Sequence, residues 1–140
     1  MKRTSRSVLL IDDDRATNFF NQHVVRRHGH FDKIFVVESG LQALDFLLDS
    51  NHEKPSLILL DINMPAMNGW EFTEAFRKLD ISIRQGIKLV ILTTSSNPDD
   101  YERSLKNEVV DDYINKPLSP SILNEMVTEH FAHEAVPDNP

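Results

Sequence analysis

Short apolar runs alternate along the chain with longer segments in which apolar residues recur every three or four positions. A short apolar run bounded by turn residues predicts a strand that is buried on both faces of a sheet. We expect strands at residues 8–11, 33–37, 56–60, 88–92 and 109–115. The third is the most informative, because it ends abruptly in the carboxylate of Asp61 and is followed by the breaker-rich segment 63–69.

The segments between these strands predict amphipathic helices. They cover residues 15–27, 41–49, 70–79, 98–106 and 120–131. In the first helix, the apolar positions expected to face the core are Ala16, Phe19, Phe20, Val24 and Val25. In the second helix, they are Leu41, Leu44, Leu47 and Leu48. Residues 81–86 are assigned to no element.

Five strands alternating with five helices predict an α/β fold, in which right-handed crossovers place helices on both faces of a parallel sheet. The 140 residues are enough for one domain with its own core, and not for two. We therefore expect an N-terminal extension at residues 1–6, one domain over residues 7–131, and a flexible C-terminal tail at residues 132–140, where the periodic pattern stops.

Composition and charge narrow the functional classes. A formal net charge of −7 argues against general binding to nucleic acid and favours a protein partner or a cation. The chain has no cysteine, which excludes disulfides and cysteine zinc sites and fits a cytoplasmic location. No apolar run approaches the roughly 20 residues that span a membrane, and the run after the basic N-terminus is too short for a signal peptide. The six histidines show no ligand spacing with a strand end, so we expect them at the surface.

Five chemically active side chains follow strands at the edge of the sheet where the carboxyl ends of parallel strands meet. They are Asp12, Asp13, Asp61, Thr93 and Lys116. Three neighbouring carboxylates repel one another, so we expect a divalent cation among them, and Mg²⁺ prefers carboxylates, waters and phosphate as ligands. Together with an ammonium and a hydroxyl, this set suits the transfer of a phosphoryl group onto Asp61.

Four segments, in order, carry a family resemblance: LLIDDD at 9–14, LILLDINMPAMNGWEF at 57–72, LTTSS at 92–96 and DYINKPL at 112–118. With them, the chain resembles the CheY-like receiver domain of two-component response regulators, of the stand-alone single-domain type. Each segment alone is a weak signal, and the four at this spacing are specific. The resemblance implies a flavodoxin-like, doubly wound sheet with strand order 2-1-3-4-5 and five helices, and the family itself is a standard example of ligand binding at a topological switch point.

The resemblance implies a role for each acidic residue. Asp61 would be the phosphoacceptor and would also bind Mg²⁺. Asp13 would bind the metal directly, and Asp12 would help through a water or as a second ligand. Asn63, two residues beyond the acceptor, would offer its backbone carbonyl to the metal.

The resemblance also implies contacts to the phosphoryl group and a switch. Thr93 would hydrogen-bond one phosphoryl oxygen, and Lys116 would pair with another. Pro117 would follow a cis peptide bond that aims Lys116 inward. Tyr113 matches the family's aromatic switch residue, whose ring would turn inward as Thr93 moves toward the phosphoryl group.

The implied function is two-component signal transduction. The phosphoryl group would come from a sensor histidine kinase or a histidine phosphotransfer protein, and the signal would pass on by protein–protein contact or along a phosphorelay. Such a protein is a signalling receiver and not an enzyme, apart from intrinsic autophosphorylation and autodephosphorylation. No nucleic-acid or membrane partner is expected.

The sequence departs from the family pattern at three places. Thr94 stands where Ala is common, Asp14 adds a third acid beside the pair, and residues 106–109 replace a turn that is usually made of small residues. None of these changes removes a catalytic position.

Two other interpretations stay open. The motif Asp12-x-Asp14 after the first strand permits a haloacid dehalogenase-like phosphatase, with Asp12 as nucleophile and Asp14 as acid/base. Against it, Ala16 departs from that family's pattern, and the chain is short. The third interpretation is a receiver that binds partners without being phosphorylated, which the intact acidic site argues against.

Overall fold

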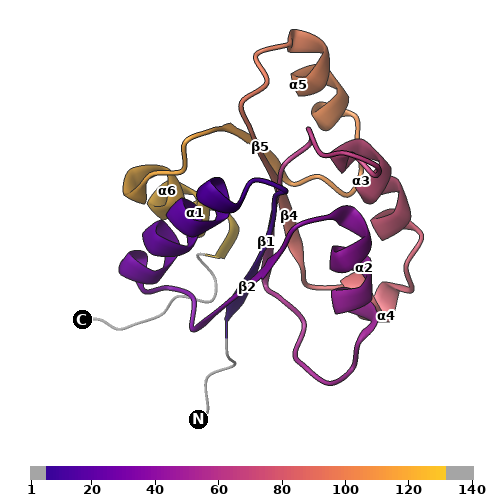
Figure 1. Ribbon diagram of the computed structural model, residues 1–140, viewed down its shortest axis with the longest axis horizontal. Coiled ribbons are helices and arrows are strands. Elements are labelled where there is room, and N and C mark those ends of the chain that lie inside the picture. The colour runs from indigo at the N-terminus through magenta and orange to yellow at the C-terminus, as the bar shows by residue number, and fades with distance from the viewer. Residues whose placement is uncertain (1–5, 132–140) are drawn as a thin grey trace.

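Five parallel strands form a single sheet in the computed structural model, which describes residues 6–131 (Figure 1). Their order across the sheet is β2-β1-β3-β4-β5, as the family resemblance implied. The strands are β1 (Ser7–Ile11), β2 (Lys33–Val37), β3 (Leu57–Leu60), β4 (Lys88–Thr93) and β5 (Asp112–Asn115). The predicted doubly wound α/β fold is therefore confirmed.

Helices cover both faces of this sheet. Figure 1 shows α1 and α6 together on one side, and α2, α3 and α4 on the other, with α5 beyond α3. Their bounds are α1 (Arg15–His28), α2 (Gly40–Leu48), α3 (Gly69–Arg77), α4 (Ile81–Arg84), α5 (Pro98–Leu105) and α6 (Pro120–Phe131). The described residues thus contain six helices where the sequence predicted five.

The additional helix is α4, a single turn in the connection to which no element was assigned. Asp80 caps its N-terminus by accepting a hydrogen bond from the Ser82 backbone N–H. At its other end, the Lys54 ammonium donates to the backbone carbonyls of Ser82 and Gln85 at 3.0 and 2.9 Å. A four-residue turn has no periodic pattern to detect, and it is held by a lysine from a distant loop.

The core consists of two apolar clusters, one on each face of the sheet. Alternation along β1 sends Val8 and Leu10 into one cluster and Leu9 and Ile11 into the other. Every residue of β1 and β3 is buried, which is the expected consequence of helices on both faces. The buried positions of α6, including Phe131, complete the cluster under α1.

Three predicted core positions of α1 are wrong, and one of them is Ala16, which is exposed. The side chains of Phe19 and Phe20 are 74% and 46% exposed, whereas Asn18 and Asn21 are buried. Val24 and Val25 are buried and define the inward face of the helix. One turn and two turns earlier, the same face carries Asn21 and Asn18. Hydrophobic periodicity cannot find a polar residue that is buried for its hydrogen bond, as Asn18 is through its bond to the Asp12 carbonyl.

The second helix shows the same kind of difference. Leu47 is buried and Leu44 is half-buried as expected, but Leu41 and Leu48 are 59% and 57% exposed. The small side chain of Ala43 lies in the core instead. The inward face of α2 is therefore narrower than its leucine content predicted.

The fifth strand begins later than predicted. Residues 109 and 110 lie in a turn before β5, where the backbone N–H of Val110 donates to the Asn107 carbonyl. The Asn107 side chain accepts from the Val109 N–H and donates to the Thr73 hydroxyl on α3. Side-chain hydrogen bonds from Asn107 thus hold a turn in a segment whose β-branched residues favoured a strand.

Both predicted flanking segments lie largely outside the described residues. The proposed tail, 132–140, is entirely outside them, and of the N-terminal extension only Arg6 is described. Within residues 6–131, none of the helices has the length and apolar content required to cross a membrane.

Candidate functional site

The site is built where β1 and β3 end side by side. Ile11 and Leu60 are paired in register, and the Asp61 backbone N–H donates to the Ile11 carbonyl at 3.0 Å. Asp12 and Asp61 therefore leave the sheet next to each other. β2 lies on one side of β1, and β3, β4 and β5 follow on the other side. The strand order therefore reverses between β1 and β3, and open α/β sheets bind ligands at such a point.

Lys116 joins the two acids from the far end of the sequence. Its ammonium lies 2.7 Å from Oδ2 of Asp12 and 3.6 Å from Oδ1 of Asp61. The Lys116–Pro117 peptide bond is cis, as the resemblance implied. The three charged groups are almost wholly buried, with 14%, 5% and 7% of the Lys116, Asp12 and Asp61 side chains exposed, so their interactions are screened little by solvent.

Both carboxylate oxygens and the backbone carbonyl of Asp12 accept hydrogen bonds. Oδ1 accepts from the Asp14 backbone N–H at 2.9 Å, and Oδ2 accepts from the Lys116 ammonium. The Asn18 amide on α1 donates to the Asp12 carbonyl at 2.7 Å. Asp12 is thus fixed in place by its own turn, by α1 and by the loop after β5.

Asp61 is the acid whose ionisation the protein opposes most clearly. Burial raises the pKa of the Asp61 carboxyl above its ordinary value of 3.8, and the neighbouring charges of Asp12 and Asp13 act in the same direction. The Lys116 ammonium and a hydrogen bond from the Asn63 backbone N–H act against this shift in pKa. A bound cation would offset the negative charge of this carboxylate.

Three of the predicted metal ligands come together. Asp12, Asp13 and Asp61 each offer one carboxylate oxygen, and these oxygens all lie within 4.8 Å of one another. An all-oxygen set with one exposed member fits Mg²⁺, which keeps several of its waters. The Asn63 side chain is exposed, and the role of its backbone carbonyl as a ligand stays a prediction.

Thr93 and Tyr113 occupy the two strands beyond β3. Thr93 ends β4 fully buried, and its hydroxyl oxygen accepts from the Ser95 backbone N–H at 3.1 Å. Tyr113, on β5, is half-buried, and its hydroxyl lies 3.4 Å from the Ser95 carbonyl oxygen. Burial raises the pKa of the Tyr113 phenol. The two predicted switch residues therefore meet at Ser95.

The loop after Asp61 needs a glycine at position 69 because the backbone packs closely there. A Cβ atom at this position would lie 2.5 Å from the Ile62 Cα and 2.8 Å from the Asp61 carbonyl oxygen. The Gly69 backbone N–H donates to the Ile62 carbonyl at 3.0 Å. The first turn of α3 thus lies directly against the backbone of Asp61, and α3 fixes the position of Asp61.

Asp14 has the capping role and not a chemical one. Its carboxylate accepts from the Ala16 N–H and from the Thr17 hydroxyl, and the Thr17 bond is the largest cause of its lowered pKa. A carboxylate that is turned toward the N-terminus of α1 and held ionised is poorly suited to act as a general acid. This geometry argues against the phosphatase interpretation, in which Asp12 is the nucleophile and Asp14 the acid.

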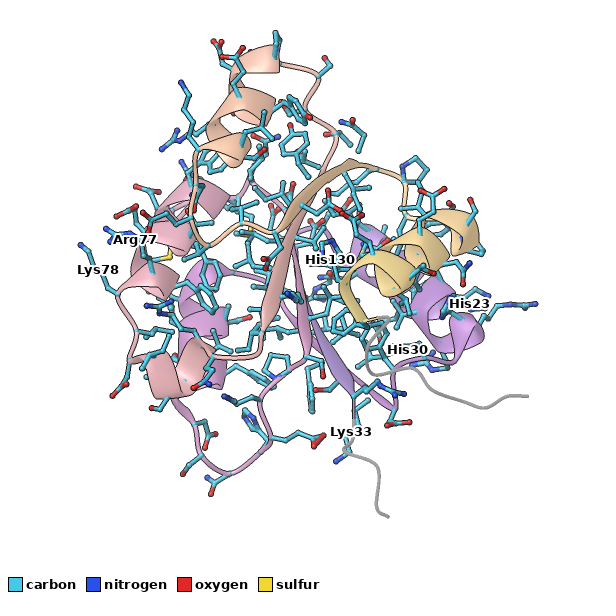
Figure 2. All side chains as sticks on the ribbon, turned by 180° about the vertical axis from the view of Figure 1, so that it is seen from behind. His23, His30, Lys33, Arg77, Lys78 and His130 are labelled. Atoms are coloured by element: carbon cyan, nitrogen blue, oxygen red, sulfur yellow. The ribbon has the colours of Figure 1, made fainter. Side chains whose placement is uncertain are left out.

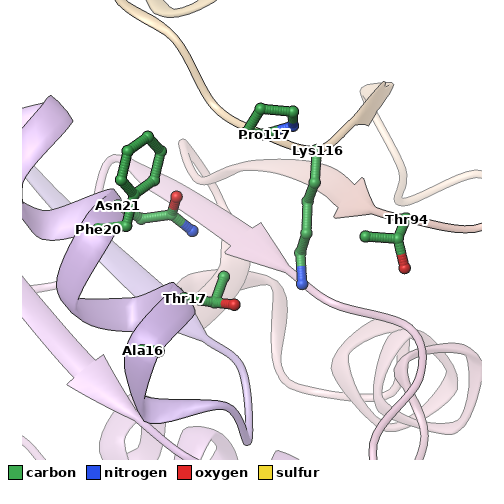
Figure 3. Close-up of a pocket in the computed structure, with 7 residues that line it drawn as sticks. All are labelled: Ala16, Thr17, Phe20, Asn21, Thr94, Lys116 and Pro117. Atoms are coloured by element: carbon green, nitrogen blue, oxygen red, sulfur yellow. The ribbon is translucent and has the colours of Figure 1, made fainter.

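A cavity of about 370 Å³ opens beside Lys116. Figure 3 shows the Lys116 side chain extending between Thr17 and Asn21 of α1 on one side and Thr94 on the other. Phe20 completes the α1 wall of the cavity. Thr94, which departs from the family pattern, therefore lines the approach to the site, and α1 supplies the opposite wall.

Most of the histidines within residues 6–131 are less exposed than the sequence predicted, and His133 lies outside the described residues. Figure 2 shows His23, His30 and His130 on the side of the sheet that α1 and α6 cover. His23 is exposed, but only 10% of the His130 side chain is, and its Nε2 lies 3.1 Å from Oδ2 of Asp112. His130 and Asp112 link α6 to the start of β5, far from any strand end that carries the acidic site.

Sequence reasoning missed three residues that shape the site. Asn18 holds Asp12, Asn21 lines the cavity, and Asp100 on α5 accepts a hydrogen bond from the Ser95 hydroxyl at 2.5 Å. Asn18 and Asn21 are three positions apart and therefore share one face of the helix that follows Asp12 and Asp13. Two polar residues on one helix face close to strand-end acids could have indicated that this face contacts the site.

Comparison with known proteins agrees with this arrangement. The family model described as "Response regulator receiver domain" matches residues 8–128. The chain belongs to the response regulator receiver domain family. It is 32% identical to Response regulator Rcp1 of Synechocystis over 86% of this chain and 82% of that protein. A crystal structure of a two-component response regulator from Cytophaga hutchinsonii aligns with a TM-score of 0.83 and 34% identity, covering 93% of this chain and 99% of that one.

The receiver domain also occurs in much longer proteins. The chain is 32% identical to Hybrid signal transduction histidine kinase I of Dictyostelium discoideum over 87% of its own length, but spans only 7% of that protein. Receiver domains act in two-component signal transduction, and this chain is one of them. A receiver of this kind is a signalling module and not an enzyme in the usual sense.

Proposed function

We propose that this receiver domain accepts a phosphoryl group on Asp61 and signals through the change that follows. The observation that carries the proposal is the burial of Asp61 between two other acids, with the Lys116 ammonium 3.6 Å from its Oδ1. A carboxylate in this setting is disfavoured as a free anion, and it lies next to a fixed positive charge that suits a phosphoryl oxygen. Its role is thus that of a nucleophile with a ready electrostatic partner.

The reaction transfers a phosphoryl group from the donor to Asp61. A carboxylate oxygen of Asp61 forms a bond to phosphorus as the bond to the donor breaks, and the donor group leaves with the electron pair. The product is an acyl phosphate, with Lys116 paired to one phosphoryl oxygen and the Thr93 hydroxyl donating to another. Asp12, Asp13, Asp61 and the Asn63 backbone carbonyl would hold a Mg²⁺ ion, which would supply neutralising charge.

The donor is a phosphorylated histidine of a sensor histidine kinase or of a histidine phosphotransfer protein. Support comes from relatives that are histidine kinases with a matching segment, such as the Dictyostelium protein. The surface of α1 beside the cavity is suited to such a partner, because Phe20 is partly exposed where it lines the cavity next to Lys116, and the preceding residue, Phe19, is also exposed. Exposed aromatic side chains are common anchors of protein interfaces.

Output follows from Thr93 and Tyr113. As the Thr93 hydroxyl turns toward the phosphoryl group, the Tyr113 ring moves inward and alters the surface of α5, β5 and α6. The phosphoryl group carries about −2 in place of the carboxylate's charge of −1, and this net addition of about −1 is large enough to bias such an element between two arrangements. The signal then passes to a protein target or to the next member of a phosphorelay. The cytoplasmic location expected from the sequence stays a prediction.

The test is phosphorylation by acetyl phosphate in the presence of Mg²⁺, followed by intact mass. We expect the wild type to gain one phosphoryl group in an adduct that is labile to hydroxylamine, and Asp61→Asn to gain none. The matched control is Asp14→Asn, which keeps a capping oxygen at α1 and should be labelled normally.

Two outcomes would favour the other interpretations. Labelling that persists in Asp61→Asn but disappears in Asp12→Asn would indicate the phosphatase, whose nucleophile is Asp12. A wild type that is not labelled and does not bind Mg²⁺ would indicate a receiver that acts only as a binding module.

A further inference from the structure

Ser95 is a centre of hydrogen bonding in the loop after β4. Its N–H donates to the Thr93 hydroxyl oxygen at 3.1 Å, and its carbonyl accepts from the Asn115 amide at 3.0 Å and lies 3.4 Å from the Tyr113 hydroxyl. Its own hydroxyl accepts from the Asn97 N–H at 3.2 Å. The position of Ser95 therefore determines how Thr93 and Tyr113 are placed relative to each other.

The Ser95 hydroxyl proton is donated to Asp100, in the first turn of α5. Oδ2 of Asp100 lies 2.5 Å from the Ser95 Oγ, and Oδ1 accepts from the indole N–H of Trp70 at 3.3 Å. One carboxylate thus connects the loop after β4 to α3. We call these three side chains the Ser95–Asp100–Trp70 bridge.

The bridge reaches the acceptor's own loop. Trp70 follows Gly69, whose backbone lies against Ile62 and Asp61. The Trp70 side chain is 6% exposed, and the Arg103 guanidinium of α5 lies 4.8 Å from the centroid of its ring. Trp70 is therefore fixed on both sides, so that the Ser95 end of the bridge is the part free to change.

We propose that Asp100 is a positioning residue that holds the loop after β4 in the arrangement of the unphosphorylated protein. This inference rests on the proposed function and names the part of the molecule that resists the switch. Phosphorylation of Asp61 draws the Thr93 hydroxyl toward the phosphoryl group, and Ser95 must follow because its N–H is bound to that hydroxyl. The bond from Ser95 to Asp100 is then strained or lost.

The bond from Ser95 to Asp100 should slow the phosphorylation of Asp61. An interaction present only in the starting arrangement lowers the population of the arrangement competent for phosphorylation, and removing it raises that population. Loss of Asp100 should therefore speed phosphorylation, although Asp100 touches neither the acceptor nor the donor. A purely structural role for Asp100 in the first turn of α5 predicts lower thermal stability without a faster reaction.

The experiment compares phosphorylation rate constants with acetyl phosphate and Mg²⁺ by intact mass. We expect Asp100→Ala to react about threefold faster than wild type or more. Asp99→Asn is the control, because Asp99 lies in the same first turn of α5 and its loss changes the same helix terminus. Trp70→Phe removes the indole N–H and keeps an aromatic ring, and it should also speed the reaction.

A double variant separates the bridge from independent effects. If Asp100 and Trp70 act through one contact, the variant with both changes should react no faster than Asp100→Ala alone. Trp70 is the only tryptophan of the chain, so its emission in the wild type should change on phosphorylation and stay constant in Asp61→Asn.

The outcomes distinguish this inference from the proposed function. Normal labelling with equal rate constants in wild type, Asp99→Asn and Asp100→Ala overturns the inference alone, as does an unchanged Trp70 emission in the phosphorylated protein. A wild type that gains no phosphoryl group overturns the proposed function and this inference with it. If Asp100→Ala does not fold, the Trp70→Phe rate constant decides the question.

Discussion

At the scale of the residue, the acidic site is a set of charges that only partly compensate one another. Asp61 is buried beside Asp12 and near Asp13, and Lys116 supplies a single positive charge to Asp12 and Asp61. Burial of an ionised group lowers stability unless it is paired. On the proposed function, the burial and the neighbouring acids that suit Asp61 to accept a phosphoryl group therefore also lower the free energy of unfolding.

The first prediction concerns this cost at Asp61. Because burial raises the pKa of Asp61 in the folded protein above its ordinary value, the free energy of unfolding falls as the pH rises through the folded pKa. Without divalent cations, Asp61→Asn should raise the free energy of unfolding at pH 7 by about 1 kcal/mol. The gain should shrink as the pH falls toward 4. Urea unfolding across this pH range measures it.

Asp14 provides a control of opposite sign. Its pKa is lowered, chiefly by the Thr17 hydroxyl, so its ionised form stabilises the folded protein above the ordinary pKa and that contribution is lost as the pH falls. Asp14→Asn should therefore not raise the free energy of unfolding at pH 7. An increase in both variants would show that net charge, and not burial at Asp61, is responsible.

The second prediction concerns the contact between α3 and the acceptor. Gly69→Ala would place a Cβ 2.5 Å from the Ile62 Cα, and a backbone atom cannot yield as a flexible side chain can. We expect a loss of about 1–3 kcal/mol in the free energy of unfolding, together with weaker Mg²⁺ binding, because the Asp61 backbone must shift. Chemical unfolding and Mg²⁺ titration test the two effects.

Gly86→Ala is the matched control for that substitution. Gly86 has a φ of 85°, and a Cβ there would meet no heavy atom within 4 Å, so the substitution acts only through the left-handed backbone. It should lower stability without changing Mg²⁺ affinity. Equal effects of the two variants on Mg²⁺ binding would contradict the role given to Gly69.

Residues at the site could be predicted where chemistry requires a particular type at a strand end. The structure places four such residues at the predicted edge of the sheet: Asp12, Asp61, Thr93 and Lys116. They lie there because the carboxyl ends of parallel strands all meet at the same edge. Asn18 could not be predicted, since its place depends on a carbonyl that becomes available only in the folded protein.

At the scale of the element, the strands were predicted more accurately than the helices. A strand buried on both faces needs only a continuous apolar run, as in β3. A helix needs its inward face to be identified, and exposed Phe19 and Leu48 show that apolar content does not settle which face is inward. The turn before β5 and the short α4 depend on side chains from other segments, and local sequence cannot show those.

The third prediction concerns α4. Lys54→Met removes the ammonium that donates to the Ser82 and Gln85 carbonyls while keeping an apolar stem. We expect the backbone N–H groups of Ile83 and Gln85 to exchange with deuterium at least about threefold faster, with a change in global stability below about 1 kcal/mol. Hydrogen exchange measured on peptides covering residues 80–87 tests this.

Lys33→Met is the control for the loss of a lysine charge. Lys33 pairs with Glu53 at 3.4 Å and is largely exposed. Exchange in residues 80–87 should be unchanged in that variant. If both variants loosen the segment equally, general electrostatics would replace the two carbonyl contacts as the explanation.

At the scale of the whole molecule, one cation should stabilise the entire fold. The three ligand carboxylates come from two strand ends, and an ion bound only in the folded state raises the free energy of unfolding by mass action.

The fourth prediction is that Mg²⁺ raises the thermal midpoint. At about 100 times its dissociation constant, the ion should add about 2.7 kcal/mol. Asp13→Asn should lose most of this increase while folding normally, since Asp13 is exposed. Calorimetry with NaCl at matched ionic strength separates specific binding from screening. An equal rise with NaCl, or an undiminished rise in Asp13→Asn, would contradict a site at these residues.

The bond between Lys116 and Asp12 also bears on protein synthesis. The two residues are 104 positions apart, and Lys116 follows the last strand. The ribosome makes the chain from its N-terminus, so a nascent polypeptide contains Asp61 well before its lysine partner exists. On the proposed function, unfinished chains cannot compete with completed copies for a phosphodonor. Only molecules that have been translated beyond β5 would then accept a phosphoryl group from a kinase.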